Sequence, residues 1–452
     1  MSQNKQRVVV VGGGYGGVAV TKNLERRIDH STTEITLVNE KESFLLTPVL
    51  SLVAGGRVDP ANATAPLRSI VRRTTVIIGS VESVDLESKH LRVRLSSGAV
   101  ETVQWDRMVL ALGSRASVPA LPGAEVSAIS VKTLDNAIEM RRHVLNQMKL
   151  AAETRDPLER AARLTCVVVG GGSTGTELVT ALQKMVRRAV VSGEIAPATT
   201  PKWILVHRHD RLLSELDERL SRTAYEVLTA QGVQVRLGVS LTSAGPSRVQ
   251  LSDGECLRAY TVIWTAGVSA NPLVSQLKLP TDDVGRVLVN SHLAVTSHPD
   301  VFAVGDSAHV PRSVYGQPAP PTAYEAKYQG RTCAVNVAAS LGRGVERVYR
   351  SRVRGPVVLL SDWCGLGQVA GVRLTGFPGW AALIVNRFFL MPTCTSRRRV
   401  LRDLTFRPSR LGRELIAGGA IRPQPGVTAH LSDADGSRFP SLPSDLVSDV
   451  LR

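Results

Sequence analysis

The chain has 452 residues, 43% of them hydrophobic, and a formal net charge of +16. This length and composition suit a globular protein of two or three domains, and we find neither an apolar run of about 18 residues nor a signal-peptide pattern. A membrane-spanning chain is therefore not expected. The positive charge favours an anionic partner, but no nucleic-acid-binding motif is recognisable, so nucleic acid is not expected as that partner.

The cysteines are scattered and show no C-x-x-C spacing; they are Cys166, Cys256, Cys333, Cys364 and Cys394. This pattern favours a reducing cytoplasm and argues against a dithiol redox centre or a zinc site. We therefore expect no metal, and we do not expect the chemistry of glutathione or thioredoxin reductases.

The first strong local signal is a run of four valines, 8–11, followed by a glycine-rich turn. The valines predict a strand buried on both faces, as in a parallel sheet. The turn fits G-x-G-x-x-G at Gly12, Gly14 and Gly17, which suits a tight turn, a close pyrophosphate and a closely packed helix. The N–H groups of that helix would face the phosphates. The stretch predicts dinucleotide binding, with a turn that binds no ligand as the alternative.

A second strand, 34–38, ends at Asn39 and Glu40, where a carboxylate usually meets a ribose. Either side chain could hydrogen-bond a hydroxyl group. Residues 76–95 alternate like a hairpin or meander, and residues 105–114 read as another buried strand that ends in glycine.

The strand–turn–helix pattern occurs again at residues 166–178, with glycines at Gly170, Gly172 and Gly175. Two such matches, separated by roughly a domain length, predict two dinucleotide sites. The following strand ends at His207 and Arg208, so the position is basic where an NAD site has a carboxylate. A basic residue there suits the 2′-phosphate of NADP; a solvated charged loop is the alternative.

The segment 376–390, GFPGWAALIVNRFFL, is aromatic and aliphatic, and arginines follow it at 397–399 and 402. This is the composition of a helix that lies in an anionic membrane interface. A core helix or a homodimer contact is the alternative. Proline, glycine, serine and aspartate dominate the end of the chain, which predicts a disordered tail over 411–452.

Six stretches resemble the two-dinucleotide-binding-domain flavoproteins, in family order over roughly 7–410: VVVVGGGYGG, FLLTPVL, LALGS, VVVGGGSTGTEL, WTAGVSANPL and VFAVGDSA. Within that group the chain resembles the type II NADH dehydrogenases, which do not pump protons. The resemblance implies an α/β fold with two Rossmann-like domains. The FAD domain would comprise 1–115 and 287–350, the NAD(P)H domain 116–286, and a C-terminal membrane-interface or dimer segment 351–410.

The resemblance also implies site residues. FAD would be held by Gly12, Gly14, Tyr15, Gly16, Gly17, Asn39, Glu40, Pro48, Ala111, Gly113, Gly305, Asp306 and Ala323, with Asp306 on the ribityl chain. NADH or NADPH would be held by Gly170, Gly172, Ser173, Thr174, Gly175, His207, Arg208, Ala266 and Gly267. Glu177 matches the family glutamate near the nicotinamide and the flavin; a carboxylate that only stabilises its helix N-terminus is the alternative.

The chain departs from the family at two places. The family's quinone signature Ala-Gln-x-Ala-x-Gln is here residues 323–328, AYEAKY, so Tyr324 and Tyr328 replace both glutamines. Tyrosine can stack on a quinone or hydrogen-bond to it, but it is bulkier. The basic loop at His207 and Arg208 resembles the arginine-bearing loop of NADPH-using glutathione reductase, which predicts use of NADPH as well as NADH.

The leading hypothesis is a flavoenzyme that is peripherally attached to the cytoplasmic face of a membrane. It would transfer hydride from NAD(P)H to FAD and then two electrons to a quinone-like acceptor. The alternative favoured by the tyrosines is a soluble NAD(P)H-dependent flavoenzyme with a specialised non-quinone acceptor. A sulfide:quinone oxidoreductase would need cysteines at the flavin, where only Cys364 is a candidate, and a slowly reacting nicotinamide sensor is the non-enzymatic alternative.

Overall fold

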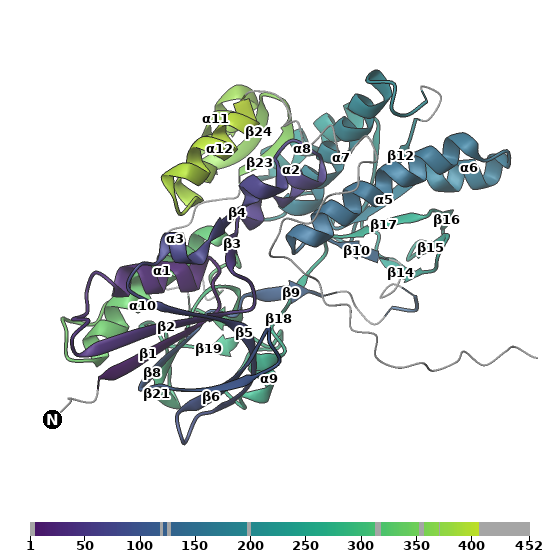
Figure 1. Cartoon of the computed structure of the whole chain (residues 1–452). Coiled ribbons are helices and arrows are strands. Elements are labelled where there is room, and N and C mark those ends of the chain that lie inside the picture. Colours follow the sequence, from purple (N-terminus) through teal and green to yellow (C-terminus); the bar gives the residue numbers. More distant parts are fainter. Residues whose placement is uncertain are drawn as a thin grey trace, which may run out of the picture.

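The structure, a computed structural model, describes residues 5–117, 121–123, 128–196, 200–311, 318–351, 357–369 and 371–405. Its main strands form two sheets, which Figure 1 shows in two lobes. The short strands β9 (Ser114–Ala116) and β18 (Val268–Ala270) pair antiparallel where the chain passes between the lobes. The predicted α/β fold with two Rossmann-like units is confirmed. The predicted disordered tail lies outside the described residues.

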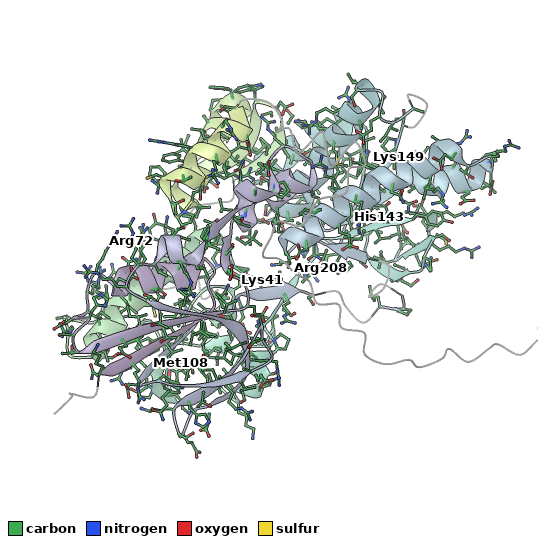
Figure 2. All side chains as sticks on the ribbon, viewed as in Figure 1. Lys41, Arg72, Met108, His143, Lys149 and Arg208 are labelled. Carbon is green, nitrogen blue, oxygen red and sulfur yellow. The ribbon has the colours of Figure 1, made fainter. Side chains whose placement is uncertain are left out.

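The larger sheet is built around β1 (Gln6–Val11), whose four valines are all buried. Val8 pairs in parallel with Ile35 on one side and with Arg107 on the other. Met108, beside Arg107, is completely buried inside this sheet (Figure 2). The remaining strands, in spatial order around β1, are β20 (Ala294–Val295), β21 (His298–Ala303), β8 (Arg107–Leu110), then β2 (Thr33–Asn39), β5 (Thr75–Asp85), β6 (His90–Leu95) and β7 (Val100–Gln104).

The strands β5, β6 and β7 form an antiparallel meander, as the alternating pattern of 76–95 predicts. The helices α1 (Tyr15–Leu24) and α10 (Ala323–Ser340) pack against each other beside the sheet. Between β2 and β5 lie shorter elements: β3 (Ser43–Leu45), η1 (Thr47–Val49), α2 (Leu50–Ala54), η2 (Pro60–Ala63), β4 (Thr64–Pro66) and α3 (Leu67–Ile70).

The smaller sheet is parallel throughout, and its central strand β11 (Thr165–Val169) is buried along its whole length. Its order is β10 (Ala128–Ser130), β17 (Thr261–Trp264), β11, β12 (Lys202–His207) and β13 (Val233–Leu237). The helices of this lobe are α5 (Leu134–Glu153), α6 (Pro157–Leu164), α7 (Ser173–Val191) and α8 (Glu218–Ala230). The small strands β14 (Leu241–Ala244), β15 (Arg248–Leu251) and β16 (Cys256–Arg258) form a sheet of their own. The remaining small elements, which lie with the larger sheet (Figure 1), are α9 (Leu273–Gln276), β19 (Val287–Leu288), η3 (Gly305–Ser307) and β22 (Ala308–His309).

The last described part of the chain forms an antiparallel sheet and two helices, which Figure 1 shows in yellow-green. These are β23 (Val357–Ser361), β24 (Cys364–Val369), β25 (Val372–Thr375), α11 (Gly376–Leu390) and α12 (Cys394–Thr405). Helix α11 matches the predicted segment 376–390 and packs on β23 and β24. The buried carboxylate of Asp403 joins α12 to η2 by accepting a hydrogen bond from the Asn62 side chain at 2.7 Å. Within the described ranges, no helix has both the length and the apolar character needed to cross a membrane.

Candidate active site

The first glycine turn brings β1 and α1 into direct contact. Gly12 has φ +107°, in the left-handed region, and a Cβ at Gly17 would lie 1.7 Å from the Gly12 carbonyl oxygen. By contrast, a Cβ at Gly14 would meet no atom within 4 Å. The glycines at both ends of the motif therefore permit close packing, and the middle one leaves open space where a phosphate could approach.

The second turn repeats this geometry between β11 and α7. Gly170 has φ +113°, a Cβ at Gly175 would lie 1.8 Å from the Gly170 carbonyl oxygen, and a Cβ at Gly172 would meet nothing within 4 Å. The two turns are therefore equivalent in structure as well as in sequence.

The residues at the ends of β2 and β12, Asn39 and His207, make equivalent contacts with the two glycine turns. The Asn39 side-chain oxygen accepts a hydrogen bond from the Gly13 N–H at 2.7 Å, and His207 Nδ1 accepts one from the Gly171 N–H at 3.0 Å. Neither residue is a carboxylate. Glu40 is exposed and lies 3.5 Å from the Ser80 hydroxyl, so Asn39 occupies the position at the turn.

His207 is held in its neutral form. Burial lowers its pKa, and the neighbouring His209 and Arg208 lower it further. Because Nδ1 accepts the backbone hydrogen bond, the ring proton is assigned to Nε2, which has no hydrogen-bond partner among the described residues. Arg208 is exposed on the lobe of the smaller sheet (Figure 2) and supplies positive charge at this position.

A single cavity of about 580 Å³ lies between the lobes and is lined from both turns. The predicted site residues in its lining are Gly14, Tyr15, Gly16, Asn39, Pro48, Ala111, Gly113, Ser173, Thr174, Glu177, Gly267, Gly305, Asp306, Ala323 and Tyr324. The predicted residues outside the lining are Gly12, Gly17, Glu40, Gly170, Gly172, Gly175, His207, Arg208, Ala266 and Tyr328. The outer glycines of each turn therefore contribute by packing rather than by facing the cavity.

Asp306 belongs to a short polar chain on the cavity wall. Its carboxylate accepts from the Ser114 hydroxyl at 2.7 Å, and Lys132 Nζ lies 3.2 Å from the same hydroxyl. Burial lowers the pKa of Lys132, and the charge of Asp306 opposes that shift. Neither Ser114 nor Lys132 is predicted from the sequence as a site residue: Ser114 only closes the LALGS stretch, and Lys132 lies in no motif.

Glu177 is buried, with 8% of its surface exposed, and every partner comes from another element. It accepts from the Ser51 hydroxyl at 2.9 Å, from the Leu359 N–H at 3.0 Å and from the Arg387 guanidinium at 2.8 and 2.9 Å. The sequence places Arg387 in a predicted interfacial helix, but its side chain is buried in this ion pair. Leu383, Arg387 and Leu390 are all buried on one face of α11. Their helical spacing is the pattern in the sequence from which burial of Arg387 could be predicted.

The two tyrosines of the altered quinone signature lie in different surroundings. Their rings stack with centroids 6.0 Å apart, but only Tyr324 lines the cavity. Tyr328 packs against the hydrophobic core, with the Arg331 guanidinium 5.2 Å from its ring centroid. Tyr324 is therefore the one that a bound molecule could meet.

Unpartnered polar atoms in the lining residues test whether a dinucleotide cofactor fits. The Tyr15 hydroxyl and Arg387 Nη1 are buried and have no hydrogen-bond partner among the described residues. Burial raises the pKa of Tyr15, so its hydroxyl keeps its proton. Buried donors of this kind are normally satisfied, so a ligand with acceptor oxygens or nitrogens suits the cavity. Together with the open space at Gly14, these atoms fit FAD.

Three comparisons with known proteins agree with this geometry. Residues 6–330 match the family model described as pyridine nucleotide-disulphide oxidoreductase. The chain is 27% identical over 400 residues to the type II NADH:quinone oxidoreductase NdhA of Mycobacterium tuberculosis, covering 84% of this chain and 82% of that protein. It is 32% identical over 307 residues to an NADH dehydrogenase-like protein of the same species, covering 67% and 72%.

Among solved structures, the chain is similar to NDH2 from Plasmodium falciparum in complex with NADH. The TM-score is 0.79 with 16% sequence identity, over 89% of this chain and 98% of that one, which shows a shared fold. The paired glycine turns, the common cavity and the matches over most of the chain agree. The chain therefore belongs to the pyridine nucleotide-disulphide oxidoreductase family and, within it, to the type II NADH dehydrogenases.

Proposed function

We propose that this chain is an FAD-dependent NAD(P)H:quinone oxidoreductase that does not pump protons. The reaction is NAD(P)H + H⁺ + quinone → NAD(P)⁺ + quinol. The observation that carries the proposal is the single cavity lined from both glycine turns, because molecules bound at the two turns would meet there. A relative named type II NADH:quinone oxidoreductase supports the choice of donor and acceptor.

The chain's own residues would bind and orient the reactants. FAD, when bound, would supply hydride acceptance and two-electron transfer. The N-terminus of α1 would face its pyrophosphate, Asp306 would accept from its ribityl hydroxyls, and Ala111 and Gly113 would cover it. We keep as a proposal the division into an FAD domain (1–115 and 287–350), an NAD(P)H domain (116–286) and a C-terminal segment (351–410).

On the nicotinamide side, Ser173 and Thr174 at the start of α7 line the cavity, with Glu177 one turn further along the helix. We propose that Glu177 positions the dihydronicotinamide. Its buried bonds to Ser51, Leu359 and Arg387 come from three separate segments and fix the carboxylate. A fixed carboxylate can orient a substrate without a large entropic cost.

We also propose that the enzyme uses NADPH as well as NADH. A carboxylate after the second strand normally binds the ribose 2′-hydroxyl and repels a 2′-phosphate. Here that place is taken by the neutral ring of His207, followed by the exposed guanidinium of Arg208. The ring can donate from Nε2 to a hydroxyl, and the arginine can pair with a phosphate.

A soluble enzyme with a specialised non-quinone acceptor is the second candidate, and Tyr324 favours it. Its ring faces the cavity at the position where the family signature has glutamine. Reduction of the bound flavin by NAD(P)H without reoxidation by any quinone would favour this candidate over the quinone reductase.

We propose peripheral attachment of α11 to an anionic membrane surface. This helix is apolar on both faces: Leu383 and Leu390 are buried, whereas Phe377, Val385 and Phe389 are each more than half exposed. A helix that is apolar all round needs a second apolar environment. The exposed Arg398, Arg399 and Arg402 on the following helix favour anionic lipid over a second copy of the chain. The free state of every cysteine favours the cytoplasmic face of that membrane.

The assignment is tested with the purified protein and one matched pair of variants. We expect the purified protein to contain one FAD per chain and to oxidise NADH only when 1,4-naphthoquinone is added. Asp306→Ala should lose both, whereas Asp300→Ala, on the neighbouring strand β21 in a partly exposed ion pair, should keep both. Full flavin content and activity in Asp306→Ala would contradict the proposed site.

A further inference from the structure

A second cavity, of about 590 Å³, lies at the C-terminal end of α10. Its walls come from the turn after α1, from α10 and from the loop that follows α10; the two helices lie side by side (Figure 1). On α10, Ala326 lines the cavity between the lobes, whereas Ala338 lines the second cavity. Twelve residues separate them along the helix, which is about 18 Å at 1.5 Å per residue. The second cavity is therefore a separate site.

Three arginines give the second cavity a positive charge. Arg27, Arg343 and Arg347 line it together with the single carboxylate of Glu346, so three positive charges and one negative charge leave +2. Arg343 is partly neutralised, because its guanidinium lies 3.6 Å from the Asp29 carboxylate. The guanidinium of Arg347 makes neither a hydrogen bond nor an ion pair with any described residue. This donor group is therefore available to a bound anion.

The backbone that carries Arg347 is held by a buried side chain. Asn336 of α10 is completely buried. Its amide oxygen accepts from the Arg347 N–H at 2.7 Å, and its amide nitrogen donates to the Arg347 carbonyl at 2.9 Å and to the His292 carbonyl at 2.6 Å. The loop is thus fixed at Arg347 before any ligand arrives, which lowers the entropic cost of binding.

The turn between α10 and Arg347 adds backbone donors. Gly344 has φ +88°, in the left-handed region, and the chain folds back there over the end of α10. Gly344, Val345 and Glu346 all line the second cavity, and their N–H groups donate to no other described residue. Successive free N–H groups in a turn form an arrangement that binds anions.

The remaining lining of the second cavity is apolar. Val335 and Ala338 come from α10, and Val345, which is 82% exposed, comes from the loop. An apolar group in the cavity would remove part of the Val345 surface from water, which favours binding. A phosphate monoester carries about −1.5 to −2 charges at neutral pH, close to the opposite of the charge of the lining. The volume is also typical of small-molecule sites.

We propose that the second cavity binds a small phosphate monoester that carries an apolar ring or chain. Its phosphate would accept from the Arg347 guanidinium and from the free N–H groups of the loop, and its apolar part would contact Val335 and Val345. Because this site lies at the opposite end of α10 from the cavity between the lobes, the bound molecule is not a reactant of the flavin. The proposal does not depend on which acceptor the flavin reduces.

The test is isothermal titration calorimetry of phenyl phosphate into the flavin-loaded protein. NAD⁺ is present in excess, so that the nucleotide site is occupied and the heat reports a different site. Arg347→Ala should raise the Kd for phenyl phosphate by on the order of 10-fold, because a charge-assisted hydrogen bond is lost. Arg350→Ala, exposed but outside the lining, should leave the Kd within about twofold.

Two further probes separate the charged and apolar contributions. Inorganic phosphate should bind more weakly than phenyl phosphate, because it lacks the ring, and phenol should give no measurable heat. The Arg347 side chain makes no contact that the fold needs, so the Tm of Arg347→Ala should equal that of wild type. Absence of phenyl phosphate binding, or equal effects of Arg347→Ala and Arg350→Ala on its Kd, would overturn the site.

Discussion

Arg208 is the exposed residue that we expect to decide whether NADPH is used. It follows His207, which is neutral and already accepts from the Gly171 N–H, so the arginine is the charge available to a 2′-phosphate. Arg208→Ala should therefore raise the KM for NADPH by on the order of 10-fold and leave the KM for NADH within about twofold. The measurement is steady-state kinetics with both nucleotides, and exposed Arg222→Ala is the control. Equal effects on both nucleotides would remove Arg208 from the site.

Site residues that lie in a motif can be predicted from the sequence, whereas their partners from distant segments cannot. The sequence predicts Glu177 because it matches the family glutamate on the helix after the second glycine motif. Its partner Arg387 is 210 residues away, and nothing local to either residue indicates the pair. Lys132 and Ser114 escaped notice for the same reason, since only the folded chain brings them to Asp306. Side chains that act through long-range contacts leave little pattern along the chain.

At the scale of elements, the glycines of one turn differ in role: Gly17 is needed for packing, and Gly14 leaves space for a ligand. Gly17→Ala would place a Cβ 1.7 Å from the Gly12 carbonyl and separate α1 from β1, whereas Gly14→Ala would meet nothing within 4 Å. We expect Gly17→Ala to be purified without flavin or as insoluble protein. Gly14→Ala should fold and bind FAD more weakly, because its methyl group enters the space for the phosphate. The ratio of flavin to protein absorbance measures both, and a fully flavinated Gly17→Ala protein would contradict the account.

The elements best predicted from the sequence are those with strong local patterns. The valines of β1, the glycine turns, the meander β5–β7 and helix α11 were all expected, and the structure has them. The pairing of β9 with β18 was not expected, because three-residue strands that are partly exposed along their whole length carry no recognisable period. The packing direction of α11 was also not expected, because its apolar residues lie on both faces.

At the scale of the whole molecule, basic side chains gather where α10 approaches the end of α11. Lys327 donates to the Phe389 carbonyl, and burial lowers the pKa of Lys327 to about 8, with Arg331, Arg397 and Lys22 lowering it too. Phe389 itself is 55% exposed. An anionic membrane under α11 would meet this charge as well as the apolar face.

This arrangement predicts membrane binding that depends on pH. Lys327 is charged below its pKa and loses that charge above it, so affinity for phosphatidylglycerol vesicles should fall between about pH 7 and pH 9. One basic group near a membrane contributes about 1 kcal/mol, or roughly 5-fold in affinity. Vesicle sedimentation of wild type and Lys327→Gln measures the effect, and the variant should bind more weakly at pH 7 with a smaller pH dependence. Phosphatidylcholine vesicles are the control, and a concentration-dependent dimer without vesicle binding would instead assign the α11 face to a second copy.

In the proposed reaction, one bound flavin exchanges electrons with a nicotinamide nucleotide and with a quinone in the same cavity. The most direct measurement is anaerobic rapid mixing of the purified protein with NADH or NADPH, followed by a second mix with 1,4-naphthoquinone, while the flavin absorbance is recorded. We expect both nucleotides to bleach the flavin and the quinone to restore its colour at a rate no slower than turnover. A flavin that neither nucleotide reduces, or that stays reduced in the presence of the quinone, would contradict it.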